Sequence, residues 1–159
     1  MLSAPEATTL DYRIVEPDDI EALYELYVQF FRESGLERLG LSLDGDKARR
    51  TLHRWIETDN PTQLIALDNA VLVGVLGWFI DRSVTVQPYA VLDKFFVRPD
   101  WRRSKVGSTL LALALDIARS EGCILFRAVP NAGLPGAAAV FIDAGFSEIP
   151  HSASLMMRL

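Results

Sequence analysis

The chain has 159 residues, and this length predicts a single domain over residues 1–159 with a frayed tail at residues 1–9. Half of the residues are hydrophobic and 23% are charged, a balance that excludes a disordered or low-complexity chain. The net charge of -5 argues against a protein that binds nucleic acid through its overall charge. One cysteine, Cys123, excludes an internal disulfide and a multi-thiolate metal site. No apolar stretch reaches the roughly 20 residues of a membrane span, so we expect a cytoplasmic protein.

The hydrophobic pattern predicts a mixed α/β fold, a central sheet with helices on both faces in the order β-α-α-β-β-β-α-β-α-β. The first helix is expected to begin at Pro17 and to end at Gly35, and the second to begin after Asp44 or Asp46. Asp68-Asn69 is the predicted turn of a hairpin. Strands are expected at residues 12–15, 63–67, 70–80, 89–97, 123–129 (buried) and 146–159 (one or two strands), and later helices at 106–121 and 137–144.

The segment of residues 98–108 connects a buried strand to a helix and is strongly basic. Residues 98–105 hold four basic residues and one acid, a local charge of +3 in an acidic chain. A loop in this position presents free backbone N–H groups at a helix N-terminus, which bind anions. Gly107 lets the backbone approach an anion closely, and Ser108 adds a hydroxyl. The residues alone leave two readings open, a phosphate-rich ligand or a solvated basic loop.

The pattern Arg102-x-x-Lys105-x-Gly107 resembles the acyl-CoA pyrophosphate loop of the GNAT superfamily of N-acetyltransferases, Arg/Gln-x-x-Gly-x-Gly/Ala. The closing Ala144-Gly145-Phe146 resembles that family's Gly-Phe turn, and the element order matches over residues 12–159. The resemblance implies a GNAT-like fold and transfer of an acetyl group from acetyl-CoA to a primary amine of a small molecule or peptide.

The resemblance also implies which residues form the site. An N–H group on the fourth predicted strand, that of Val97, where we expect the strand to bulge, would stabilise the oxyanion. Asp93 is the expected general base because it alternates with Phe95 and Val97; the alternative is a carboxylate paired with Lys94. The residues expected to bind acetyl-CoA are Phe95, Phe96, Val97, Arg102, Arg103, Ser104, Lys105, Val106, Gly107, Ser108, Asn131 and Phe141.

Two positions depart from the family pattern. Lys105 replaces the first glycine of the loop, and Phe141 stands where the family often has a tyrosine that protonates the leaving thiolate. We therefore expect a substitute acid near Tyr89 or Asn131, or slow turnover. Both departures keep a second reading open, a degenerate fold that binds acyl-CoA without efficient chemistry.

The identity of the amine is not predicted by these motifs. The run from Leu92 to Val97 is similar to the acetyltransferase domain of N-acetylglutamate synthases, which keeps a glutamate-type amino-acid substrate as an alternative. His53 and His151 are far apart in the sequence, so no metal is expected. The expected partners are acetyl-CoA and an amine, with no nucleic acid and no membrane, and a homodimer is left open.

Overall fold

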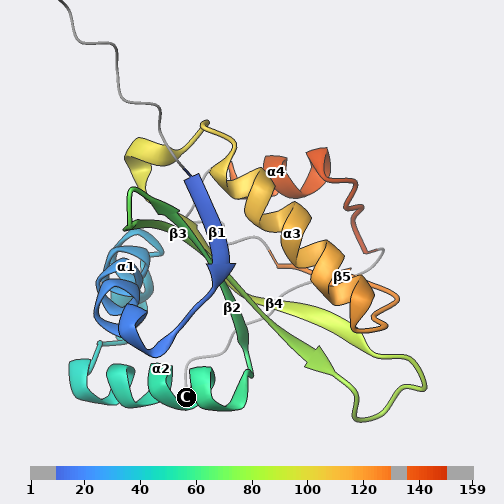
Figure 1. Ribbon diagram of the computed structural model, residues 1–159, viewed down its shortest axis with the longest axis horizontal. Coiled ribbons are helices and arrows are strands. Elements are labelled where there is room, and N and C mark those ends of the chain that lie inside the picture. Colours follow the sequence, from blue (N-terminus) through green and yellow to red (C-terminus); the bar gives the residue numbers. More distant parts are fainter. Residues whose placement is uncertain (1–9, 130–135, 150–159) are drawn as a thin grey trace, which may run out of the picture.

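The computed structural model describes residues 10–129 and 136–149. The elements of the sheet and its helices follow one another as expected over most of the chain (Figure 1). The strands are β1 (Leu10–Ile14), β2 (Thr62–Asp68), β3 (Val71–Asp81), β4 (Tyr89–Val97) and β5 (Phe126–Arg127); the α-helices are α1 (Ile20–Glu33), α2 (Gly45–Thr58), α3 (Val106–Ser120) and α4 (Ala137–Asp143); the short 3-10 helices are η1 (Pro17–Asp19), η2 (Leu36–Leu39) and η3 (Pro99–Trp101).

The five strands form one sheet in the order β1-β2-β3-β4-β5. Neighbours are antiparallel from β1 to β4, and β4 and β5 are parallel, as expected for strands connected by a crossover through α3. Helices α1 and α2 lie on one face of the sheet and α3 and α4 on the other (Figure 1). The mixed α/β sheet with helices on both faces is therefore confirmed.

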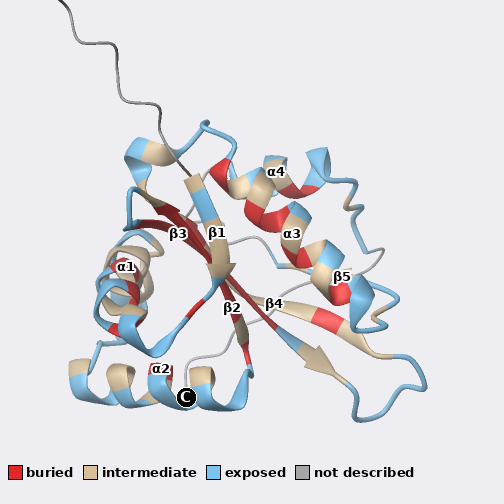
Figure 2. Ribbon diagram, in the orientation of Figure 1, coloured by how far each residue is buried: buried red, intermediate tan, exposed pale blue. Residues whose placement is uncertain are grey.

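Two apolar clusters, one on each face, hold these layers together (Figure 2). On the α1 face, Leu23 and Leu52 contact the buried side chains of Ile65 and Val75. On the α3 face, Leu110 belongs to a separate cluster with side chains of the same strands. Strands β2 and β3 are buried on both faces, which explains their nearly continuous apolar sequence.

Helix α2 begins where the sequence predicts. The Asp44 carboxylate accepts a hydrogen bond of 2.9 Å from the Lys47 N–H, the interaction of a favourable N-cap. Helix α1 follows η1, and its buried residues are Ile20, Leu23 and Leu26. Tyr27 of the same helix is half-buried.

The β2–β3 hairpin turns one residue later than predicted. Asp68 pairs with Val71, so the two turn residues are Asn69 and Ala70, with φ of 46° and 67°. Two positive φ angles are typical of the turn that fits the twist of a hairpin. Asparagine adopts this conformation readily and alanine does not, which is why the sequence favoured Asp68-Asn69.

The predicted buried strand at residues 123–129 is wrong in both length and burial. Only Phe126–Arg127 form β5, and the side chains of Ile124, Leu125 and Val129 are exposed by 67%, 51% and 61%. Among the described residues β5 pairs with β4 alone, so it has one strand neighbour there, where a buried strand has two.

Of the range 146–159, in which one or two strands are predicted, only residues 146–149 are described, and they are not in a strand. The rest of that range, the expected tail at residues 1–9 and Asn131 lie outside the described residues. Among the helices that the structure describes, none is both long and apolar enough to cross a membrane.

Candidate active site

The site begins at a free edge of β4. Strand β5 pairs with β4 only at Ala90 and Val91, so the β5-facing edge of β4 is unpaired from Leu92 onward within the described part of the chain. The Arg98 N–H donates to Val73 O on β3 at 2.9 Å. Because successive residues of a strand direct their N–H groups to opposite sides, the Val97 N–H points to the free edge.

The bulge of β4 lies at Asp93 and not at Val97. Gly77 pairs with Lys94, and Trp78 pairs with Leu92, so Asp93 is the extra residue. The expected alternation of Asp93 with Phe95 and Val97 is also wrong, because one inserted residue moves the preceding side chains to the opposite face.

Asp93 accordingly lies on the α1 face with Lys94. The Lys94 Nζ is 2.8 Å from Asp93 Oδ1, and the Asp93 side chain is only 15% exposed. Its other oxygen, Oδ2, is buried and has no hydrogen-bond partner in the described part of the chain. The ion pair between Asp93 and Lys94 that the sequence left as the alternative is thus present, but it engages only one of the two carboxylate oxygens of Asp93.

Phe95 projects to the other face, toward α3. A Cβ added at Gly107 would lie 3.1 Å from Phe95 Cζ, so the glycine allows the first turn of α3 to approach the strand. The Phe95 ring is 5.5 Å from the ring of Phe141, which is 3% exposed and is also 5.2 Å from the ring of Phe146. The structure therefore places Phe95, Gly107 and Phe141 together, in an aromatic environment.

The loop between η3 and α3 carries unusual backbone angles. Arg103 has a φ of 68° and Lys105, the N-cap of α3, has a φ of 67°. This left-handed conformation favours glycine, which explains why the family pattern has a glycine at the position of Lys105. Gly107 itself is helical.

The same loop presents a row of backbone donors. In the described part of the chain, the N–H groups of residues 103–108 have no hydrogen-bond partner. Three of them, at Val106, Gly107 and Ser108, belong to the first turn of α3, where no preceding carbonyl is available. Their partial positive charge and the exposed side chains of Arg103 and Lys105 make this N-terminus suited to an anion.

Arg102 makes internal contacts that the sequence did not predict. Its Nε donates to Val97 O at 3.0 Å, and its guanidinium is paired with Glu33 of α1 at 2.5 Å. The guanidinium also lies 5.3 Å from the centroid of the Phe96 ring. Arg102 therefore connects the end of β4 to the end of α1, whereas Arg103 makes no ion pair among the described residues.

The remaining candidates divide into two groups. Ser104 and Ser108 stay in the loop, where their hydroxyls donate to Trp101 O and, at 3.0 Å, to Lys105 O. Tyr89 is remote from the loop. It lies eight residues before Val97 on β4, roughly 26 Å along a strand.

The Tyr89 hydroxyl already donates to Asp81 at 2.9 Å, which raises the pKa of Tyr89. Tyr89 is therefore not placed to act as a substitute acid, and Asn131 is not described.

Two residues near Asp93 escaped the sequence analysis. Tyr27 of α1 donates a short hydrogen bond to Gln63 Oε1. Burial, and then the negative charge of Asp93, raise the pKa of Tyr27 well above its usual value. The only signal in the sequence was an amide, Gln63, at the head of an apolar strand.

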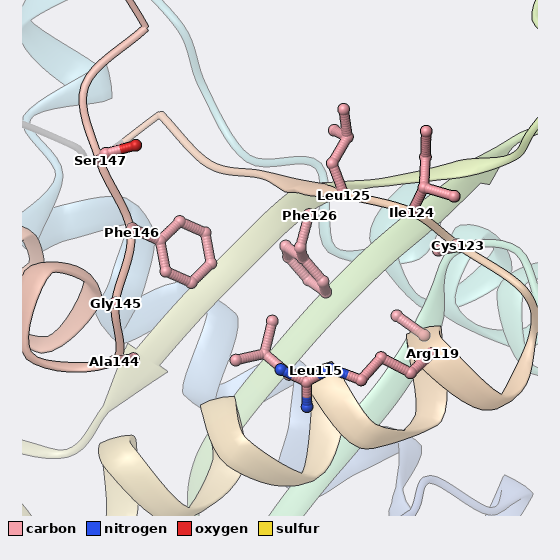
Figure 3. A pocket seen from close by; sticks show the side chains of 11 residues that line it. Leu115, Arg119, Cys123, Ile124, Leu125, Phe126, Ala144, Gly145, Phe146 and Ser147 are labelled. Atoms are coloured by element: carbon pink, nitrogen blue, oxygen red, sulfur yellow. The ribbon is translucent and has the colours of Figure 1, made fainter.

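Two cavities lie away from the loop. One, of about 330 Å³, is lined by the C-terminal half of α3, by β5 and by residues 144–147. Figure 3 shows the rings of Phe126 and Phe146 above Leu115 in this cavity. The other, of about 480 Å³, lies between α1 and the connection to α2 and includes Tyr24, Phe31 and Leu41.

Comparison with known proteins gives one family. The family model described as the acetyltransferase (GNAT) family matches residues 20–146. No curated protein matches the chain.

Solved structures support the fold. An aminoglycoside N-acetyltransferase, AAC(6')-Iy, in complex with CoA has a TM-score of 0.79 and 18% identity over 99% of this chain and 100% of its own. A predicted acetyltransferase with acetyl-CoA from Clostridium acetobutylicum has a TM-score of 0.74 and 15% identity over 93% of this chain and 96% of its own.

Proposed function

The chain belongs to the GNAT family of acetyltransferases, and from this membership we propose that it transfers the acetyl group of acetyl-CoA to a primary amine of a small molecule or peptide. The observation that carries the proposal is the free edge of β4 beside the unpartnered N–H groups at the start of α3. A thioester along such an edge meets a backbone donor, while its diphosphate meets the helix N-terminus.

On the donor side, the N–H groups of residues 103–108 bind the pyrophosphate, with Arg103 and Lys105 adding charge. Gly107 permits the first turn of α3 to approach β4 closely, because the Phe95 ring already occupies the space that a side chain at Gly107 would need. The Val97 N–H donates to the thioester oxygen and stabilises the negative charge that develops there. These roles require only groups that the structure places at one end of the sheet.

On the acceptor side, Asp93 is the base. Its free Oδ2 takes a proton from the amine as the nitrogen forms its bond to the carbonyl carbon. The C–S bond then breaks, and the thiolate leaves. Phe141 has no proton to give, so the thiolate takes one from water; thiols of this kind have a pKa near 8.5, which makes this departure feasible.

An amine panel tests the proposal, with free CoA thiol as the readout. The panel contains neamine, spermidine, histamine, glutamate and a peptide with a free N-terminus. Two observations favour cationic amines: the net charge of -5, and a solved structure of AAC(6')-Iy with a CoA-acetylneamine bisubstrate analogue, which has a TM-score of 0.77 and 18% identity over 95% of this chain and 100% of its own.

The expected result is thiol release that depends on at least one amine. Release with glutamate alone supports an amino-acid N-acetyltransferase instead. The buried Phe141 favours one competing function, an acyl-CoA-binding module. That function predicts thermal stabilisation by acetyl-CoA, about 2.7 kcal/mol at 100 times Kd, with no thiol release by any amine.

A further inference from the structure

A buried polar cluster lies on the α1 face of the sheet, opposite the aromatic side of the site. Gln63 is 1% exposed and extends across β3 toward β4. Gly77 makes this path available, because a Cβ at that position would be 2.5 Å from Gln63 Nε2. Buried amides are rare without full hydrogen bonding, yet Gln63 Nε2 has no partner in the described part of the chain.

Gln63 determines how the neighbouring hydroxyl is used. Tyr27 has one hydroxyl proton, and it is donated to Gln63 Oε1. The lone pairs of the Tyr27 oxygen are therefore left to accept hydrogen bonds. Asp93 lies next to Lys94, which pairs with Gly77, the residue that the Gln63 side chain crosses. Asp93 contributes a second acceptor, because Lys94 occupies only Oδ1 and Oδ2 has no partner among the described residues. The buried Asp93 Oδ2 and the oxygen of the half-buried Tyr27 are thus two acceptors without donors among the described residues, and they match a group that carries several N–H protons.

We propose that Tyr27 and Asp93 form the ammonium subsite of the acceptor substrate, and that Gln63 is a positioning residue that makes the Tyr27 oxygen an acceptor by taking its proton. This inference rests on the function proposed above. The substrate ammonium donates one N–H to Tyr27 Oη and one to Asp93 Oδ2. One proton passes to Asp93 Oδ2, which becomes a neutral carboxyl group, and the electron pair left on the nitrogen forms the bond to the carbonyl carbon. The second proton leaves the nitrogen after this bond has formed and passes through water to the departing thiolate.

The bulge of β4 places this subsite. Without the extra residue, Asp93 would lie on the α3 face and could not meet Tyr27. The amine therefore approaches the sheet from the side of α1, while the loop that binds the anion lies at the start of α3. The recognised group is the primary amine in its charged form, and it shares the Asp93 carboxylate with the Lys94 ammonium, which takes Oδ1.

The test compares Gln63→Glu with Gln63→Met. Glutamate keeps an oxygen that accepts the Tyr27 proton whether or not it is ionised, and methionine fills a similar volume without an acceptor. A merely structural role predicts that methionine is tolerated better, because a buried carboxylate is costly. The positioning role predicts the opposite order for the amine KM, with Gln63→Glu closer to the parent than Gln63→Met.

Steady-state kinetics with the best amine of the panel give the readout. We expect Gln63→Met to raise the amine KM roughly 10-fold, the effect of losing a hydrogen bond to a charged group, and Gln63→Glu to stay within about 3-fold of the parent. Tyr27→Phe should match Gln63→Met, and the double variant should be no worse than Tyr27→Phe. The Kd of acetyl-CoA should not change in any of them. Gln87→Leu, at an exposed position, is the matched control.

The outcomes separate the two proposals. If no amine releases thiol, the proposed function fails and this inference fails with it. If turnover occurs and Gln63→Met has the parent's amine KM, or performs better than Gln63→Glu, the positioning role is overturned while the function stands. Should Gln63→Met not fold, Tyr27→Phe decides alone: a normal amine KM in that variant rejects the subsite.

Discussion

The two faces of β4 have opposite chemistry. On the α1 face, Asp93 and Lys94 form an ion pair next to a buried tyrosine and amide. On the α3 face, Phe95 contacts Gly107 and Phe141 in an aromatic environment. A single extra residue separates them, because the bulge moves Asp93 from the aromatic face to the polar one. Local register, and not composition, thus decides that the Asp93 carboxylate lies on the polar face and the Phe95 ring on the aromatic face.

Removal of the base should have the largest effect. We expect Asp93→Asn to lower kcat about 10²–10⁴-fold, since an amide cannot accept the proton, and to leave the Kd of acetyl-CoA unchanged because the loop lies on the other face. Stopped-flow measurement of thiol release, beside calorimetric titration of acetyl-CoA, checks both. Asp116→Asn, at an exposed i,i+3 pair with Arg119, is the control. Full activity in Asp93→Asn would show that Asp93 is only an ion-pair member.

Overfilling the aromatic face should change the affinity for acetyl-CoA, which Asp93→Asn should leave unchanged. Gly107→Val places carbon within 3.1 Å of Phe95, and such overpacking costs about 1–3 kcal/mol. We expect acetyl-CoA binding to weaken and the melting temperature to fall. Ala112→Val, at an exposed position of the same helix, controls for the introduction of a β-branched residue. Normal acetyl-CoA affinity in a folded Gly107→Val protein would contradict the close approach.

Phe141→Tyr tests whether the aromatic face lacks an acid. A hydroxyl that reaches the thiolate should raise kcat, by about 10-fold or more given the usual worth of general acid help. The buried hydroxyl should also cost about 1–3 kcal/mol if it finds no partner. Measuring kcat and unfolding in urea separates the two effects. An unchanged kcat, with Phe146→Tyr as a comparison within the same stack, would mean that no acid is needed at this position.

Alanine substitutions of the two loop arginines, Arg102 and Arg103, should differ in their effect on stability. Arg103→Ala is expected to weaken acetyl-CoA binding about 10-fold, by loss of a charge-assisted contact, with little change in stability because Arg103 is exposed. Arg102→Ala should also lower the melting temperature, since it loses Glu33 and Val97 O. Titrations of acetyl-CoA at two salt concentrations measure the affinity, and thermal unfolding measures the stability. Equal stability of the two variants would show that the Arg102 contacts are not structural.

The smallest expected effect is a gain in the free energy of unfolding. Lys105→Gly should stabilise the protein by about 1 kcal/mol, because a non-glycine residue with positive φ carries a cost of that order. Lys105→Ala keeps the conformation and removes the charge, so a comparison of the two in urea unfolding isolates the backbone effect. No gain for Lys105→Gly over Lys105→Ala would mean that the angle is not strained.

Much of this arrangement was predictable, because periodicity and end signals are local. The boundaries of β4 and the start of α3 were predicted to the residue, and Asp44 was predicted as one of two starting points for α2. The failures at the site share a cause: they depend on contacts between distant residues. The bulge at Asp93 is a relation between β3 and β4, and the pairing of Arg102 with Glu33 joins residues 69 positions apart. Neither leaves a mark in the spacing of apolar residues.

If the proposed acyl donor binds the Arg102 guanidinium, the ion pair between Arg102 and Glu33 makes its binding a competition. Any phosphate that takes the guanidinium must first displace a carboxylate at the end of α1. The measured dissociation constant then combines two equilibria, the opening of the Arg102–Glu33 pair and the binding of the phosphate to the free guanidinium. A substitution of Glu33 would therefore change the dissociation constant although Glu33 makes no contact with the ligand. By reciprocity, a donor that releases Arg102 also weakens the hold of the loop on the helix that carries Tyr27.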